Sequence, residues 1–228
     1  MNEELSIIFP ALNERVRLIP TLNDYYSVFG DSVEYIVVDN GSTDGTKEAV
    51  VQQFPHVTYI RSEVPLGKGG AVYEGFNHAT SDIIGFTDPD GATLAVEFTK
   101  LLAKMEECDM AIGSRWLPLS QILPRQSILR QINSRLFNLF VRAFLSLPFT
   151  DTQCGAKVIK KSVYEKVKAH LTQKEFSFDV DLIHKVLRAG HTVCEVPIVW
   201  KHVEGGSTFK PFRSGIRAVR DVWQLRHG

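Results

Sequence analysis

Short apolar segments alternate with longer segments of mixed polarity along the first half of the chain. The apolar segments have the length and residue types of buried strands, and the mixed segments open with turn residues and continue at helical spacing. The predicted strands are 5–10, 33–39, 57–61, 83–87 and 110–112. The helices between them are expected to end near residues 29, 54, 80 and 108. This alternation predicts an α/β fold, with a mostly parallel sheet covered by helices on both faces.

The alternation stops near Arg115, and the next residues, up to about Pro148, are basic, apolar and predicted to be mainly helical. Beyond them we expect strands at 156–159 and 192–200, a helix at 178–189 and a basic helix at 213–226. The chain shows no internal repeat and no low-complexity linker. We therefore expect a single domain over residues 1–228, with residues 1–115 and 116–228 as its two halves.

The predicted helix at 127–147 is amphipathic. At about 100° per residue its polar residues form one stripe, and the remaining apolar arc is wider than a surface helix needs. The stripe consists of Gln131, Ser134, Arg135, Asn138, Arg142 and Ser146. Two explanations stay open: burial in the protein or an oligomer interface, and an interfacial helix in a membrane surface. We prefer the membrane surface, and the helix at 213–226 would give it a second contact.

Charge is balanced overall but unevenly distributed. The 228 residues include 26 Lys and Arg and 26 Asp and Glu, so we expect no nucleic-acid partner. Between Asp109 and Asp151, however, five arginines occur without any acid, and from Lys201 onward six Lys or Arg stand against two acids. This asymmetry predicts a basic face for phosphates or for an anionic surface.

The cysteines and the N-terminus bear on location. Three cysteines without a C-x-x-C spacing indicate free thiols in a reducing compartment. The first residues lack the basic and apolar regions of a secretory signal, and no apolar run reaches the roughly 18 residues that cross a bilayer. We therefore expect a cytoplasmic protein, peripheral on the cytoplasmic face of a membrane.

Two carboxylates, Asp88 and Asp90, follow the predicted strand at 83–87, with Pro89 between them and Gly91 after them. Carboxylates at the C-terminal end of a buried strand lie where open α/β sheets bind ligands. Two such groups can hold a hard cation, Mg²⁺ or Mn²⁺, that also binds substrate phosphates. The alternative is an ordinary strand-to-helix turn, because Asp, Pro and Gly are all turn residues.

Three further polar groups follow predicted strands: Glu14 after Pro10, the pair Asp39-Asn40, and the loop Gly67-Lys68-Gly69-Gly70. The loop could bring N–H groups and an ammonium to a phosphate, although its spacing matches neither the Walker A pattern nor G-x-G-x-x-G. Each group alone is also explained as a cap or a tight turn. In a parallel sheet these strand ends share one edge, so together they predict a pocket for a nucleotide diphosphate and its metal.

Several motifs, in this order and spacing, resemble the family 2 glycosyltransferases of the GT-A fold, and among these the polyprenyl-phosphate sugar synthases. The motifs are Phe9–Glu14, Val37–Thr46, Gly67–Gly69, Asp88–Gly91 and Gly113–Arg115. The segment Asp151–Lys157 (Asp-Thr-Gln-Cys-Gly-Ala-Lys) is similar to a segment of dolichyl-phosphate β-glucosyltransferases. Residues 178–182 and 195–200 also match that branch.

This resemblance implies a metal-dependent, inverting transferase that moves a sugar onto a polyprenyl or dolichyl phosphate. The first candidate for the sugar is glucose, donated by UDP-glucose. Residues 1–115 would bind the nucleotide sugar, and residues 116–228 would face the acceptor and the membrane. The nucleoside would be held by Pro10, Leu12, Glu14, Val38, Asp39 and Asn40. The donor diphosphate would meet Gly67, Lys68, Pro89 and Lys210, and its metal would bind Asp88 and Asp90. Arg115 and Arg130 would contact phosphate, including that of the acceptor, and with Asp90 they are the expected catalytic residues.

Several alternatives remain open. The chain departs from the usual family pattern at Asn40, Pro89, Gly91-Ala92 and Thr208, which leaves the base and the metal preference undecided. GDP-mannose is the second candidate donor. A soluble or polysaccharide acceptor would need a general base, for which Asp151 is the candidate. A catalytically silent membrane-docking scaffold is the non-enzymatic alternative, and a homo-oligomer or a membrane-protein partner also stays open.

Overall fold

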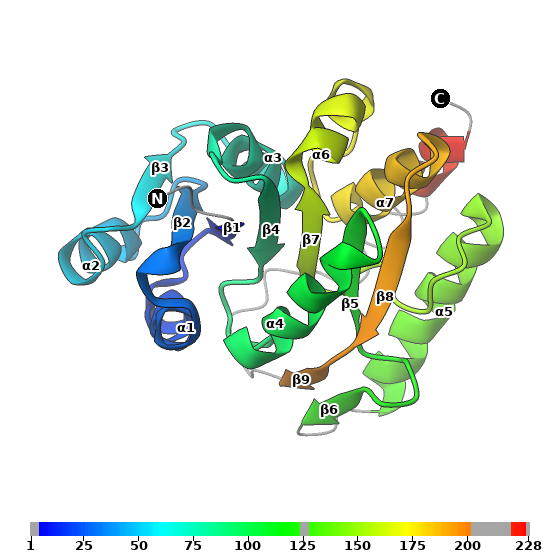
Figure 1. The fold of residues 1–228 in the computed structure, drawn as a ribbon, viewed down its shortest axis with the longest axis horizontal. Coiled ribbons are helices and arrows are strands. Elements are labelled where there is room, and N and C mark those ends of the chain that lie inside the picture. The colour runs from blue at the N-terminus through cyan, green and yellow to red at the C-terminus, as the bar shows by residue number, and fades with distance from the viewer. Residues whose placement is uncertain (1–4, 124–127, 202–219, 227–228) are drawn as a thin grey trace.

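The structure is a computed structural model that describes residues 5–123, 128–201 and 220–226, without the side chains of residues 128–134 and 137. Within these residues seven strands form one sheet, in the spatial order β3-β2-β1-β4-β7-β5-β8, with helices on both faces (Figure 1). The strands are β1 (Leu5–Ala11), β2 (Val33–Asp39), β3 (Thr58–Arg61), β4 (Ile83–Thr87), β5 (Met110–Ser114), β7 (Ala156–Lys160) and β8 (Val193–Pro197). The helices are α1 (Arg15–Phe29), α2 (Thr46–Gln53), α3 (Gly67–His78), α4 (Ala95–Ala103), α5 (Ile128–Leu145), α6 (Lys161–Val167) and α7 (Phe178–Arg188). Residues 220–226 are also helical.

The sheet is mostly parallel, as predicted, but it contains an antiparallel strand at its centre. Strands β3, β2, β1 and β4 are parallel, so that Ala11 lies opposite Asp39 and Asp39 lies opposite Arg61. Strand β7 runs antiparallel to both of its neighbours, β4 and β5, and pairs Ala156 with Thr87. The beginning of β7 therefore lies at the same edge of the sheet as the end of β4.

Most predicted elements are confirmed, with differences in the second half of the chain. The strand at 33–39 is found with its predicted bounds, and the other early strands agree to within a few residues. The predicted strand at 192–200 is divided into β8 and β9 (Val199–Lys201), and β9 pairs with β6 (Gln121–Leu123) in a second, two-stranded sheet. Helix α6 was not predicted, because its seven residues are too few to show a clear helical period.

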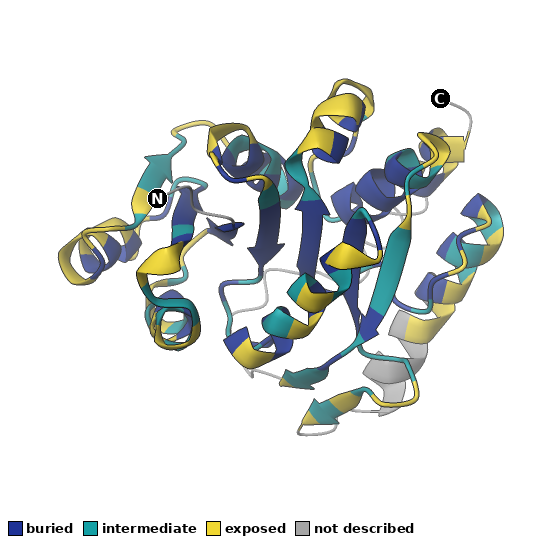
Figure 2. Ribbon diagram, in the orientation of Figure 1, coloured by how far each residue is buried: buried dark blue, intermediate teal, exposed yellow. Residues whose placement is uncertain are grey.

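Apolar residues cover both faces of the sheet. Ile7 belongs to a buried cluster that includes Tyr25 of α1 and Phe98 of α4, whereas its neighbour Ile8 belongs to a second cluster that includes Phe86 and residues of α3 and α7. Successive residues of a strand point to opposite faces, so a strand buried on both faces is apolar along its length. Figure 2 shows the central strands as largely buried. This two-sided burial produces the continuous apolar runs of the sequence.

Helix α5 exposes part of its apolar arc. Leu136 and Leu139 are each 59% exposed, while Asn138 of the polar stripe is only 3% exposed. Val141 and Leu145 are buried and anchor the helix to the core. Among the described residues no helix is both long enough and apolar enough to span a bilayer. Interfacial membrane contact by α5 stays a prediction.

Candidate active site

The loops that follow β1 and β2 are tied together at the C-terminal edge of the sheet. Asn13 N donates to Ser42 Oγ (2.8 Å), Thr43 N donates to Asn13 Oδ1 (2.8 Å), and Arg15 N donates to Asp44 Oδ2 (3.0 Å). Asn13 has a left-handed backbone, with φ of 56°, which Asn tolerates better than most residues. The turn after β2 therefore joins two loops of the site in addition to starting α2.

The residues predicted to hold the nucleoside line the ends of β1 and β2. They are Pro10, Leu12, Glu14, Val38, Asp39 and Asn40. Leu12 is 39% exposed, whereas Pro10 and Val38 are buried. Burial raises the pKa of Glu14, hydrogen bonding from Arg17 opposes this, and the charges of Asp90 and Asp88 raise it further. Glu14 therefore lies within electrostatic reach of the acid pair.

Asp39 and Asn40 already have partners within the protein. Asp39 is fully buried, its Oδ2 lies 2.9 Å from Arg61 Nη1, and its Oδ1 accepts a hydrogen bond from Ser42 N (2.8 Å). Asn40 Oδ1 accepts a hydrogen bond from Leu66 N (2.7 Å), just before α3. Both side chains therefore shape the wall of the site, and their contact with a nucleoside stays a prediction.

Asp88 and Asp90 come directly after β4 and lie close to each other. Burial raises the pKa of Asp90, and the charge of Asp88 raises it further. Asp90 Oδ1 accepts a hydrogen bond from Ala92 N (3.0 Å), and Pro89 O accepts one from Thr21 Oγ1 (3.0 Å), so the turn is fixed. Two carboxylates that repel each other in a half-buried turn favour a cation between them.

Gly155 gives the side chain of Asp88 its space. Asp88 N donates to Gly155 O (2.9 Å), and a Cβ atom on residue 155 would lie 2.1 Å from Asp88 Oδ2 and 2.3 Å from its Cγ. Any side chain at position 155 would therefore displace the carboxylate. The sequence analysis did not assign Gly155 a role, although it belongs to the segment similar to dolichyl-phosphate β-glucosyltransferases.

The acid pair fits a divalent cation that binds together with a diphosphate. Carboxylate oxygens are the ligands that Mg²⁺ and Mn²⁺ prefer. In the part of the chain that the structure describes, no group of three or more His, Cys, Asp or Glu could hold a metal. An ion held by Asp88 and Asp90 would therefore keep open positions for substrate phosphates and water.

Packing explains the glycines of the predicted phosphate loop. Gly67 has a φ of 75°, and a Cβ atom there would lie 2.4 Å from Lys174 O. A Cβ atom on Gly69 would lie 2.2 Å from Phe178 Cβ. The segment before α7 thus packs directly against the start of α3. Lys68, a predicted diphosphate contact in this loop, reaches Asp88 with its side chain. Its Nζ lies 2.6 Å from Asp88 Oδ1.

A second ion pair lies behind the first and was missed by the sequence analysis. The side chains of Lys157 and Asp179 are 1% and 4% exposed, and Lys157 Nζ donates to Asp179 Oδ1 and to Cys154 O (2.6 Å). Burial raises the pKa of Asp179, while the charges of Lys157 and Lys68 oppose that rise. In the sequence, Lys157 and Asp179 belong to two segments that resemble the same family branch, but no local pattern indicates that they form a pair.

Arg115 binds Asp151 in a bidentate ion pair. Arg115 Nε lies 2.7 Å from Asp151 Oδ2, and Arg115 Nη2 lies 2.9 Å from Oδ1. Burial raises the pKa of Asp151, but Arg115 outweighs this and leaves that pKa below its usual value. A fully buried carboxylate with this partner is poorly placed to take a proton from an acceptor. The geometry therefore disfavours Asp151 as the general base for a soluble acceptor.

In the described part of the chain, buried hydrogen-bond donors without a partner occur at Trp116, next to Arg115, and on helix α5. Within the described residues Trp116 Nε1, Asn138 Nδ2 and Arg142 Nε are buried and have no hydrogen-bond partner. The Arg135 guanidinium lies 4.7 Å from the centre of the Trp116 ring, and Asn138 Oδ1 accepts a hydrogen bond from Thr152 Oγ1 (3.2 Å). Arg135 and Asn138 of α5 therefore contact Trp116 and Thr152, the chain neighbours of Arg115 and Asp151.

Two predicted phosphate contacts cannot be placed. Arg130 belongs to α5, but its side chain is outside the described residues, and Lys210 lies wholly outside them. Their predicted roles stay predictions.

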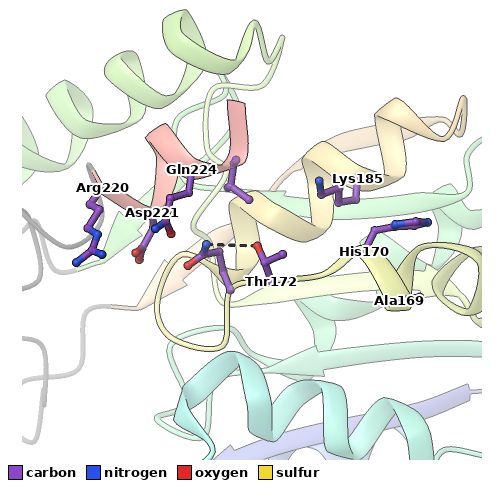
Figure 3. Close-up of a pocket in the computed structure, with 9 residues that line it drawn as sticks. Ala169, His170, Thr172, Lys185, Arg220, Asp221 and Gln224 are labelled. Atoms are coloured by element: carbon purple, nitrogen blue, oxygen red, sulfur yellow. Dashed lines mark hydrogen bonds between the residues drawn. The ribbon is translucent and has the colours of Figure 1, made fainter. Parts of the chain in front are cut away.

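The helix at 220–226 is attached to the start of α7, where Ser177 Oγ donates to Asp221 Oδ2 (2.9 Å). A cavity of about 690 Å³ lies between this helix, α7 and residues 169–173 (Figure 3). Figure 3 shows Arg220 and Asp221 on one side of the cavity and His170 on the other. Neither acid of the pair lines it, so this cavity is separate from the candidate active site.

Comparison with known sequences places this arrangement among its relatives. The family model described as "Glycosyl transferase family 2" matches residues 6–168. A dolichyl-phosphate beta-glucosyltransferase of Dictyostelium discoideum is 30% identical over 99% of this chain and 74% of its own length. A protein of the same name from Saccharomyces cerevisiae is 29% identical over 97% of this chain and 74% of its own length.

Solved structures show the same architecture. Glucosyl-3-phosphoglycerate synthase from Mycobacterium tuberculosis in complex with UDP has a TM-score of 0.73 at 18% identity, covering 99% of this chain and 80% of that chain. Its complex with Mn²⁺, UDP and glucosyl-3-phosphoglycerate has a TM-score of 0.70. At this level of identity the similarity concerns the fold alone.

Proposed function

This chain belongs to glycosyl transferase family 2, and from that premise we propose that it transfers glucose from UDP-glucose to the phosphate of a polyprenyl or dolichyl lipid at the cytoplasmic surface of a membrane. The family and the GT-A fold expected from the motifs are confirmed. The observation that carries the proposal is the pair Asp88 and Asp90, placed with Lys68 at the sheet edge that also holds the predicted nucleoside residues. The names of the two relatives support glucose and a dolichyl-phosphate acceptor.

On the donor side, the chain's residues would bind and orient the nucleotide sugar. Asp88 and Asp90 would hold Mg²⁺ or Mn²⁺, which when bound offsets the charge that develops on the departing diphosphate. Because Gly155 has no side chain, the Asp88 carboxylate has the space to point toward such an ion. The ammonium of Lys68 adds a positive charge beside the acids, where it can bind a phosphate oxygen.

On the acceptor side, orientation and positive charge are sufficient. A lipid phosphate is already anionic at neutral pH, so its oxygen can attack the anomeric carbon without a general base. A new bond forms between that carbon and the phosphate oxygen, the bond to the donor diphosphate breaks, and its electron pair leaves with the diphosphate. Direct displacement of this kind inverts the anomeric configuration. The buried donors of Trp116 and Asn138 near Arg115 support an anionic acceptor, because such donors favour oxyanions.

The outer surface of α5 and the C-terminal helix support membrane contact. Leu136 and Leu139 are each 59% exposed and Trp223 is 56% exposed. Arg226 Nη1 donates to Phe144 O (3.0 Å), so the two helices lie side by side. Exposed arginines occur on both helices. Apolar side chains accompanied by cations match an anionic lipid surface, where the apolar groups enter the bilayer boundary and the cations meet headgroups.

A donor and acceptor panel tests the proposed reaction. The protein would be incubated with Mn²⁺ and either UDP-glucose or GDP-mannose, with and without polyprenyl phosphate, and the released nucleoside diphosphate would be measured. We expect UDP release that needs both UDP-glucose and the lipid phosphate. GDP release instead would support the mannosyl alternative, and turnover with a soluble acceptor alone would move the acceptor away from lipid. Absence of both turnover and metal-dependent nucleotide binding would refute the proposal.

A further inference from the structure

We propose that Lys68 occupies an Asp88 oxygen that the divalent cation needs, and releases it when a nucleotide diphosphate arrives. Lys68 would thereby couple the binding of metal to the binding of nucleotide. This inference rests on the proposed function, since it takes Asp88 and Asp90 as the residues that hold the ion. It gives Lys68 a role distinct from that of a simple diphosphate contact, with its own measurable consequence.

The ammonium of Lys68 neutralises an otherwise isolated oxygen. Lys68 Nζ lies 2.6 Å from Asp88 Oδ1. That oxygen is shielded from solvent and, within the described residues, no donor makes a well-directed hydrogen bond to it. Both carboxylate oxygens lie close to Gly155, because a Cβ atom there would be 2.1 Å from Oδ2 and 2.7 Å from Oδ1. The contact is therefore an ion pair between half-buried groups, and a cation that approaches Asp88 must compete with a charge of its own sign.

Lys68 also lies in the electrostatic field of a second carboxylate. Asp179 acts on Lys68 electrostatically, as Asp88 does. Asp179 lies next to Phe178, and Lys68 Nζ is 6.0 Å from the centre of the Phe178 ring. An ammonium that leaves Asp88 would therefore still be stabilised by the negative charge of Asp179. The pairing of Lys157 with Asp179 holds this second carboxylate in place.

Coupling between metal and nucleotide follows from this competition for Asp88. A cation on Asp88 favours Lys68 away from Asp88, and a diphosphate, which offers oxygens to the ammonium, favours the same displacement. Each ligand therefore lowers the cost of binding the other, in addition to any direct bond between metal and phosphate. Without nucleotide, the metal must break the ion pair unaided, so its affinity is reduced.

Binding of Mn²⁺ alone tests this inference without any turnover. Free Mn²⁺ would be measured by electron paramagnetic resonance during titration of the full chain, with and without UDP. For Lys68→Met we expect Mn²⁺ alone to bind about five- to tenfold more tightly than to the wild type, as estimated for loss of a half-buried charged competitor. UDP should then raise the Mn²⁺ affinity of the variant by a smaller factor than it raises that of the wild type.

A matched control and a second variant separate the outcomes. Lys174→Met makes the same substitution at an exposed lysine near the start of α3, and it should leave the Mn²⁺ affinity unchanged. Asp179→Asn removes the second carboxylate, so it should weaken binding of Mn²⁺ alone, the opposite sign to Lys68→Met. Thermal unfolding would show whether each variant is folded. If Lys68→Met is not folded, Lys68→Gln would be measured in its place.

The results distinguish this inference from the proposed function. If Lys68→Met binds Mn²⁺ alone no more tightly than the wild type, the displacement model is wrong. If the wild type binds no Mn²⁺ even with UDP, the proposed function fails instead.

Discussion

Replacing Gly155 by Ala should disable the acid pair while leaving the fold intact. The new Cβ would lie 2.1 Å from Asp88 Oδ2, closer than the 3.0 Å that real contacts respect, so the carboxylate must retreat by about 1 Å. A misplacement of about 1 Å in a catalytic group costs on the order of 100-fold in rate, which corresponds to about 2.7 kcal/mol. Gly155 does not have a positive φ, so Ala adds no backbone strain there.

The assay combines turnover, metal binding and stability. We expect kcat to fall about 100-fold and Mn²⁺ affinity in the presence of UDP to fall with it, while the thermal unfolding midpoint changes little. Gly113→Ala is the control, because it makes the same change in strand β5, where the closest atom to the new Cβ would be Cys154 Sγ at 3.1 Å. Wild-type turnover and metal affinity in Gly155→Ala would refute the reasoning, and so would equal losses in both variants.

Further predictions concern stability, pH, the metal and the membrane. Lys157→Met should destabilise the fold by about 3–5 kcal/mol in urea unfolding, because it leaves buried Asp179 without its partner; an unchanged midpoint would contradict this. Hydrogen bonds from Lys160 and Thr192 hold the pKa of Asp109 below its usual value. The ionised Asp109 carboxylate therefore stabilises the fold fully above about pH 4, and this contribution is lost as the pH falls through the lowered pKa. Asp109→Asn should therefore be less stable than the wild type at neutral pH, with a gap that narrows on acidification; a constant gap would count against this role. EDTA should abolish turnover and Mn²⁺ should restore it, whereas persistent activity would exclude the metal role. Changing Leu136 and Leu139 to Ser should reduce sedimentation with phosphatidylserine vesicles but not UDP binding, and equal sedimentation would contradict membrane contact by α5.

The first half of the fold could be predicted because its strands are buried on both faces. A strand such as Val33–Asp39 is buried at all positions but Glu34 and is mostly apolar, and the turn residues that follow it mark its end. Strand order is different, because pairing depends on residues far apart in the chain. Nothing local in Ala156–Lys160 indicates that this strand inserts between β4 and β5 and runs against them.

The candidate site could be predicted only in part, because some of its residues form a local pattern and others depend on contacts between distant segments. Asp88 and Asp90 are recognisable because their chemistry is contained in a short turn after a strand. The role of Gly155 depends on its contact with Asp88, and the pairing of Lys157 with Asp179 joins β7 to α7. Neither contact leaves a local pattern. The glycines at 67–70 are a different case, because packing against residues 174–178 already accounts for them, while the predicted phosphate contact of this loop stays a prediction.

The antiparallel direction of β7 explains why one short segment serves both halves of the site. Because β7 runs against β4, its first residue pairs with Thr87, and the residues just before it pass beside the acids. A parallel strand in the same position would bring Lys160 to this edge and leave Gly155 at the opposite one. As it is, Gly155 contacts Asp88 after β4, while Asp151 binds Arg115 after β5. The segment 151–155 therefore connects the proposed donor side to the proposed acceptor side within five residues.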